Sequence, residues 1–127
     1  MEQNGQKLTV SAEDYLEAAL LLELNGARIK VTSIAENLGV SKPAVTNALS
    51  ELAAKGLMHK QPYGDIRLTD AGRAVAEEVY GKHKLLREFL CALGVSPHTA
   101  DIDCCKIEHV LSDETVRCIR AFMHKPA

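Results

Sequence analysis

Apolar residues in the first half of the chain recur at helical spacing, between residues that start and end helices. The segment SAEDYLEAALLLELNG begins at Ser11, which suits an N-cap, and ends at Asn25 and Gly26. Its apolar positions are expected to bury most of this helix, namely Leu16, Ala19, Leu20, Leu22 and Leu24. The next segment, VTSIAENLGVSKPAVTNALSELAAKGLM, divides at Gly39 into two short helices, with Thr32 and Ser41 as expected N-caps. Two short helices around a glycine-containing turn predict a helix-turn-helix.

The pattern changes after Gly56. LMHKQPYGDIRLT places proline and glycine between two short extended segments, which predicts a hairpin. Thr69 then starts a long helix that closes at Gly94, a further helix is expected from Pro97 to Leu111, and Ser112 caps a last one. The predicted fold class is mainly α, with an N-terminal winged helix-turn-helix of three helices and a two-stranded wing in residues 1–72. An all-helical domain is predicted for residues 73–127.

Composition and charge narrow the class of protein. The 127 residues are 46% apolar, enough for one domain or two fused halves, and the formal net charge is -2. Between Arg28 and Arg67, however, the chain has six basic residues and only three acidic ones. No apolar run approaches the length of a membrane span, and MEQNGQKLTV lacks the order of a secretory signal, so we expect a cytoplasmic protein without a membrane partner. The four cysteines show no disulfide-framework spacing and no CxxC.

The basic section carries side chains suited to a DNA groove on the second helix of the helix-turn-helix. Asn47 can pair with adenine, Ala44 or the Thr46 methyl can contact thymine, and lysine or arginine can contact phosphates. Val45, Ala48, Leu49 and Leu52 would face the core instead. The candidate DNA-binding residues are Ser41, Lys42, Pro43, Ala44, Thr46, Asn47, Ser50, Lys60, Tyr63 and Arg67. The alternative is a simple packing unit with a solvated charged surface, but the adjacent wing and the local charge favour binding to double-stranded DNA.

A second constellation is typical of a metal site. Cys105, Glu108 and His109 lie at i, i+3 and i+4, so on a helix they share one face, and all three are ligands of first-row metals. Asp14 and Glu17 repeat the spacing on the first helix, and His83 lies midway along the long helix. Each group also has an ordinary interpretation. The acidic pair can favour the helix dipole, His83 can be a surface histidine, and Cys105 can be a small core residue.

The order of these motifs resembles the diphtheria-toxin-repressor family of metal-dependent transcriptional regulators, including its manganese-transport-regulator branch. The resemblance is carried by EDYLEAALLLE, IAENLGVSKPAVTNALSELAAKGL, LTDAGRAVAEEVYGKHKLLREFL and CKIEHVLSDE, and it spans about Val10 to His124. It implies an N-terminal winged helix, a helical metal-binding and dimerisation domain, and a repressor of metal-uptake genes that is active when Fe(II) or Mn(II) is plentiful. It also implies a homodimer on an inverted-repeat operator.

Some candidate metal ligands match the manganese branch of the family and others match the iron branch. Asp14 and Glu17 look like the acidic pair of the manganese branch, His83 matches a histidine of both branches, and Glu108 with His109 matches a shared pair. Cys105 looks like the cysteine of the iron branch. The family usually has glutamate at the position of Arg87, and the iron branch has histidine at the position of Asp101. These two departures put a full second metal site in doubt, although Asp101 or Asp103 can partly replace its oxygen donors.

The metal itself stays open at this point. Oxygen and nitrogen ligands suit Mn(II), whereas the Cys105 thiolate shifts preference toward Fe(II), Co(II), Ni(II) or Zn(II). A metal-independent winged-helix regulator with a redox switch at Cys104 and Cys105 is the alternative function. A metal-dependent hydrolase is a third class, but no nucleophile elbow or phosphate loop supports it, so we do not expect an enzyme.

Overall fold

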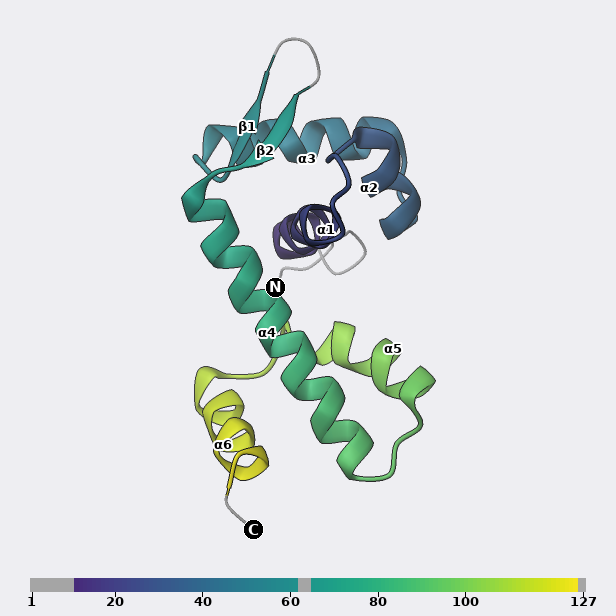
Figure 1. Ribbon diagram of the computed structural model, residues 1–127, viewed down its shortest axis with the longest axis vertical. Coiled ribbons are helices and arrows are strands. Elements are labelled where there is room, and N and C mark those ends of the chain that lie inside the picture. The colour runs from purple at the N-terminus through teal and green to yellow at the C-terminus, as the bar shows by residue number, and fades with distance from the viewer. Residues whose placement is uncertain (1–10, 62–64, 126–127) are drawn as a thin grey trace. The chain divides into compact units, whose positions relative to one another are not determined.

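The computed structural model describes residues 11–61 and 65–125, and these residues form two compact units. The units are Met1–Glu77 and Glu78–Ala127, so the division falls inside one long helix, α4, at Asp70–Ala92. A boundary between residues 72 and 73 stays a prediction from the sequence. The helices, the two-stranded sheet and their order confirm the predicted mainly α fold (Figure 1). No helix among the described residues is long and apolar enough to cross a membrane.

The first helix of the first unit, α1, spans Ala12–Leu24 and begins as predicted. The Ser11 hydroxyl accepts a hydrogen bond from the Asp14 amide, and the Asp14 carboxylate accepts one from the Ser11 amide, which completes a capping box. Leu16, Ala19 and Leu20 are buried, but the expectation for Leu24 is wrong, since its side chain is 62% exposed. Leu24 is the last helical residue, so its side chain lies beyond the surface that the core covers.

The helix-turn-helix consists of α2, Val31–Leu38, and α3, Lys42–Ala54. Gly39 ends α2 with φ of 69°, a left-handed conformation that glycine adopts without steric cost. Ser41 caps α3 through the Ala44 amide, as predicted. The prediction that Thr32 caps α2 is wrong. Lys30 is the N-cap residue and makes no side-chain capping bond, and Thr32 already lies in the first helical turn.

The wing consists of β1, Met58–Lys60, and β2, Ile66–Leu68, which pair antiparallel with Met58 opposite Leu68. The inward residues of both strands are buried, and Ile29 forms an isolated bridge to Ile66 that joins the wing to the segment before α2. The side chains that fill the core of this unit come from all three helices and the wing. They include Leu16, Ile34, Val45, Leu49, Leu52, Met58 and Leu68.

Thr69 joins the wing to α4. Its hydroxyl accepts a hydrogen bond from the Gly72 amide at 2.9 Å and donates one to the Gly56 carbonyl at 2.7 Å. The first interaction caps α4 as the sequence predicts, and the second ties that cap to the residues that follow α3. Gly72 is buried beside this cap, and a Cβ at its position would come within 1.9 Å of the Leu57 carbonyl oxygen, so the close approach requires glycine.

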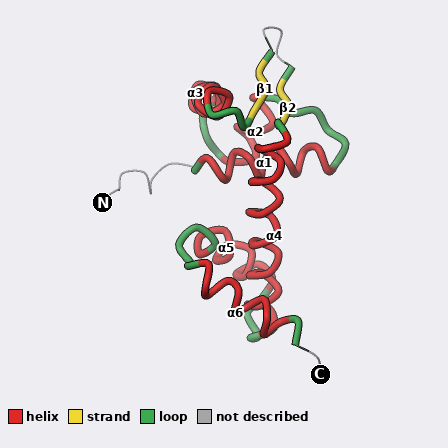
Figure 2. The backbone as a smooth tube through the Cα atoms, turned by 90° about the vertical axis from the view of Figure 1, so that its left-hand side faces the viewer, coloured by secondary structure: helices red, strands yellow, loops and turns green. Residues whose placement is uncertain are grey.

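The second unit contains the later part of α4 with α5, Pro97–Ile107, and α6, Asp113–Met123 (Figure 2). Ser96 and Ser112 cap α5 and α6 through the amides three residues on. Phe89 of α4 and Phe122 of α6 make an edge-to-face contact with ring centroids 6.4 Å apart. The α5 helix ends at Ile107 and not at Leu111 as predicted, so Glu108 is its C-cap residue and His109 lies in the turn that follows.

Candidate metal centre and nucleic-acid interface

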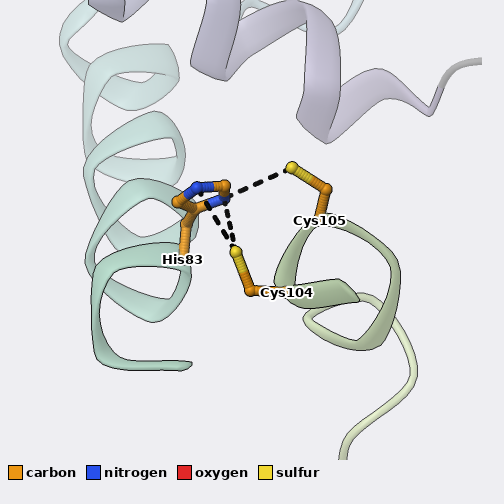
Figure 3. A group of neighbouring side chains, drawn as sticks. All are labelled: His83, Cys104 and Cys105. Atoms are coloured by element: carbon orange, nitrogen blue, oxygen red, sulfur yellow. Dashed lines mark hydrogen bonds between the residues drawn. The ribbon is translucent and has the colours of Figure 1, made fainter. Parts of the chain in front are cut away.

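A histidine and two cysteines meet between α4 and α5. His83 projects from α4 toward Cys104 and Cys105 of α5 (Figure 3). His83 Nδ1 lies 3.7 Å from each of the two sulfurs, and Nε2 lies 3.5 Å from Cys104 Sγ. Cys104 is fully buried and Cys105 is exposed, yet both thiols reach the same imidazole. Sequence analysis named Cys105 but not Cys104 as a candidate ligand, because the contact of Cys104 with His83 depends on how α4 packs against α5.

Burial makes Cys104 a poor acid. Its thiol donates a hydrogen bond to the Asp101 carbonyl at 3.4 Å, and the desolvation of the sulfur raises its pKa from 9.0 to about 12. The nearby Cys105, Glu108 and Asp101 side chains act in the same direction, because each disfavours a further negative charge. At neutral pH Cys104 is therefore a neutral thiol that ionises only if a bound cation displaces its proton or a base accepts it.

Glu108 provides a carboxylate beside this cluster. Its side chain is 1% exposed, and Oε2 lies 3.6 Å from His83 Nδ1 while Oε1 lies 3.5 Å from His109 Nε2. Neither oxygen has a hydrogen-bond partner among the described residues. Buried carboxylate oxygens are normally hydrogen-bonded or bound to a cation, so two such oxygens beside two imidazoles suit a metal ion. The donor set is thus compatible with a divalent cation.

Lys82 and Arg87 of α4 each contact the α5 segment. The Lys82 ammonium donates to the Glu108 backbone carbonyl at 3.3 Å, a contact that sequence analysis did not anticipate and that holds the last turn of α5. Arg87 Nε lies 2.5 Å from Asp101 Oδ1. The Asp101 carboxylate therefore pairs with a protein cation at the position where the sequence left a partial second metal site open.

The acidic pair predicted as ligands lies on α1 in the first unit. Asp14 is half-buried, and its carboxylate takes part in the capping box with Ser11. Glu17, one turn later, is buried with 9% exposure.

The candidate DNA-binding residues of α3 form one outward face. Among them, Ser41, Lys42, Pro43, Asn47 and Ser50 are exposed, and Ala44 and Thr46 are half-buried. Their neighbours Val45, Leu49 and Leu52 fill the core, as predicted, while Ala48 is only half-buried. This division leaves short polar side chains and one lysine in the first turns of α3, where they are free to approach a groove.

The wing adds two exposed cations. Lys60 lies on β1, and Arg67 on β2 is opposite His59 and pairs with Asp65 at 3.1 Å. An exposed ion pair of this kind is worth at most about 1 kcal/mol, so Arg67 can exchange Asp65 for a phosphate at little cost. Tyr63 lies outside the described residues.

An apolar hollow of about 630 Å³ opens on the second unit between α4 and α6. Phe122 and Leu93 are each 64% exposed at this surface. We call it the α4–α6 face, and it is lined by Phe89, Leu93, Glu114, Thr115, Cys118, Ile119 and Phe122. Large apolar side chains with this exposure are typical of surfaces that contact another protein.

Comparisons with known proteins agree with this layout. Residues 7–66 match the family model described as the N-terminal DNA binding domain of iron dependent repressors, and residues 69–127 match the one described as their metal binding and dimerisation domain. The chain is 38% identical to an uncharacterised helix-turn-helix transcriptional regulator of Methanocaldococcus jannaschii over 93% of this chain and 96% of the relative. It is 37% identical to the transcriptional regulator MntR of Escherichia coli, over 89% of this chain and 73% of the relative.

Solved structures show the same fold. The manganese regulator SloR superposes with a TM-score of 0.81 and 30% identity, over 93% of this chain and 55% of that chain. A manganese-dependent transcriptional repressor in complex with manganese gives a TM-score of 0.80 and 28% identity, over 91% of this chain and 54% of that chain. The chain thus spans about half the length of these two structures.

Proposed function

The chain belongs to the iron-dependent repressor family, and on that premise we propose that it is a metal-dependent DNA-binding transcriptional repressor that acts as a homodimer. The observation that carries the metal dependence is the buried Glu108 carboxylate, which lies beside two imidazoles and has no hydrogen bond among the described residues. The exposed polar face of α3 and the cations of the wing support the DNA-binding part.

We assign six residues to the metal. Four belong to the second unit, namely His83, Cys105, Glu108 and His109, and two belong to α1 of the first unit, namely Asp14 and Glu17. The assignment of the first-unit pair rests on the ligand pattern in the sequence. A bound divalent cation, Fe(II) or Mn(II), would supply the positive charge that allows these carboxylates and the thiolate to share one site.

The residues of the chain then account for control of DNA binding. Asp14, Glu17 and Glu108 all carry carboxylates, so without a cation the two proposed ligand sets offer no attraction between the first unit and the second. When both ligand sets are engaged, the α3 helices of a dimer keep a fixed separation, which matches the two halves of an inverted-repeat operator. The coupling between metal and DNA is expected to be about 1–3 kcal/mol, and DNA must tighten metal binding by the same factor.

The α4–α6 face is our proposed pairing surface for the homodimer. It is apolar, it carries the exposed Phe122 and Leu93, and it lies in the part of the chain that matches a dimerisation domain. A twofold axis at this surface brings the same aromatic residues of two subunits together, which gives a self-complementary contact.

The central experiment measures DNA affinity of the reduced, full chain by fluorescence anisotropy under anaerobic conditions. An inverted-repeat library is titrated with chelator, Mn(II), Fe(II) and Zn(II) in parallel. We expect tighter binding with the activating metal by about 5- to 150-fold. Equal affinity with chelator and with every metal would contradict the proposal and favour a metal-independent regulator.

A matched pair of variants tests the first-unit ligands. Glu17→Gln removes one proposed ligand charge and is expected to reduce the metal-dependent gain in DNA affinity to near unity. Glu13→Gln removes a charge from the same helix, one turn earlier, and is expected to leave the gain intact. If the two variants behave alike, Glu17 is not a metal ligand.

Base contacts and phosphate contacts are separable on α3. Lys42→Ala is expected to weaken binding to all sequences similarly and to lower the slope of log affinity against log salt by about 1. Asn47→Ala is expected to change base preference at one position of each half-site, with a cost of about 1–3 kcal/mol. Lys84→Ala, which removes a cation that stacks on Tyr80 in the second unit, serves as the charge control.

A further inference from the structure

The two adjacent cysteines of α5 and His83 form a cluster that the proposed regulatory site uses only in part. Cys104 has no role among the six proposed ligands, yet its sulfur is as close to the imidazole as that of Cys105. One ligand atom from each of the three residues lies within 4.8 Å of the other two. All three residues belong to the second unit, and Figure 3 shows both thiols turned toward the ring.

The nitrogen–sulfur distances in this cluster are close to those between two ligands of a tetrahedral ion. Zn–S bonds of about 2.3 Å and Zn–N bonds of about 2.0–2.1 Å at the tetrahedral angle separate sulfur from nitrogen by about 3.6 Å. His83 Nδ1 lies 3.7 Å from both sulfurs. These nitrogen–sulfur distances allow the imidazole and both sulfurs to hold one ion without a large movement of α4 against α5, which leaves a fourth position for water.

The donor types decide the class of cation. Two thiolates and one imidazole prefer borderline and soft ions such as Zn(II) or Cd(II), whereas Mn(II) prefers oxygen ligands. Binding releases the proton of each coordinating thiol to solvent, because the thiolate is the ligand. An ion can approach the cluster from solvent, since Cys105 is exposed, whereas Cys104 is buried.

We propose that His83, Cys104 and Cys105 form a thiolate-rich cation site within the second unit that binds Zn(II) or Cd(II). The site shares His83 and Cys105 with the proposed regulatory set, and its regulatory consequence rests on that proposed function. A thiophilic ion held here occupies two regulatory ligands without engaging Asp14 or Glu17. Zn(II) or Cd(II) bound at this site would therefore not activate DNA binding in the way that Fe(II) or Mn(II) does.

The test is a titration of the reduced, metal-free full chain with Cd(II) under anaerobic conditions, followed by the ultraviolet charge-transfer absorption of cadmium–thiolate bonds. The wild type is expected to show the intensity of two thiolates. Cys104→Ser and Cys105→Ser are each expected to lower it by about half, because one thiolate remains. Cys91→Ser, which alters a half-buried cysteine outside the cluster, is expected to keep the full intensity.

Two further variants serve as controls for the cadmium titration. Cys104→Ala repeats the loss with an apolar side chain, so that a misfolded serine variant does not decide the outcome. Asp14→Asn is expected to leave the cadmium band unchanged, because the site needs no ligand from the first unit. Full band intensity in both Cys104 variants, or loss of the band in Asp14→Asn, would overturn the proposal.

The same proteins separate this inference from the proposed function. If Mn(II) or Fe(II) controls DNA binding but the Cys104 variants keep the full cadmium band, only the thiolate-rich site is wrong. If the band behaves as expected but no metal alters DNA affinity, only the repressor mechanism is wrong. In the wild type, Zn(II) is expected to support DNA binding less well than Mn(II) or Fe(II), and Cys104→Ala is expected to reduce that difference.

Discussion

Replacement of Glu108 by glutamine should have opposite effects on the metal-free and metal-bound protein. The carboxylate is 1% exposed and neither oxygen is hydrogen-bonded among the described residues. A buried unsatisfied polar group costs about 1–3 kcal/mol, and imidazoles at 3.5 Å and 3.6 Å recover part of that cost. Removal of the charge should therefore stabilise the metal-free protein by about 1 kcal/mol, which corresponds to a rise of about 4 °C in Tm for a chain of this size.

The metal-bound state should respond in the other direction. A cation present at 100 times its Kd stabilises the wild type by about 2.7 kcal/mol, or roughly 10 °C in Tm, and Glu108→Gln should lose most of that gain. Differential scanning calorimetry of the full chain with chelator and with Mn(II) measures both effects, with Glu88→Gln on the exposed surface of α4 as the control. A variant that melts lower without metal and keeps the full Mn(II) shift would refute the assignment of Glu108.

Three other results are expected from the geometry. Thr69→Val should lower the free energy of unfolding by about 1–2 kcal/mol, measured by urea denaturation, because it removes both the cap of α4 and the hydrogen bond to Gly56. Thr69→Ser keeps the hydroxyl and should retain most of the wild-type stability. Phe122→Ser should weaken dimerisation by about 2 kcal/mol, roughly 30-fold in Kd, by analytical ultracentrifugation, and an unchanged dimer would place the pairing surface elsewhere. In the metal-free protein at pH 8, Cys104 should be alkylated more slowly than Cys105 when followed by tandem mass spectrometry, because its thiol is buried and its raised pKa keeps it protonated. Equal rates would favour the redox alternative.

Local signals in the sequence were sufficient for most of the fold. Capping residues, glycines and the change from helical to extended spacing each act over a few residues, so Ser11, Gly39 and Ser41 mark their helix ends correctly. The prediction of Thr32 as an N-cap was wrong because a threonine one or two positions inside a helix looks the same in sequence as one at its start. The start of α2 depends on the extended backbone conformation of Lys30, which cannot be read from the sequence.

The candidate site was harder to predict because it depends on how α4 lies against α5. Helical spacing placed Cys105, Glu108 and His109 near one another, but it could not show that Cys104 also reaches His83 on another helix. The structure brings both thiols to His83 and commits Asp101 to Arg87. Such contacts join residues 14 to 22 positions apart, which lies beyond the range of any periodic pattern.

The close approach of α4 to the chain that follows α3 has a consequence for experiments that scan every position. Any side chain at Gly72 would overlap the Leu57 carbonyl oxygen, so even alanine there must displace backbone at the base of the wing. Gly72 should consequently score as intolerant in a saturation screen for repression, although it offers neither a ligand atom nor a base contact. A screen read without this geometry would mistake a steric requirement for a recognition residue.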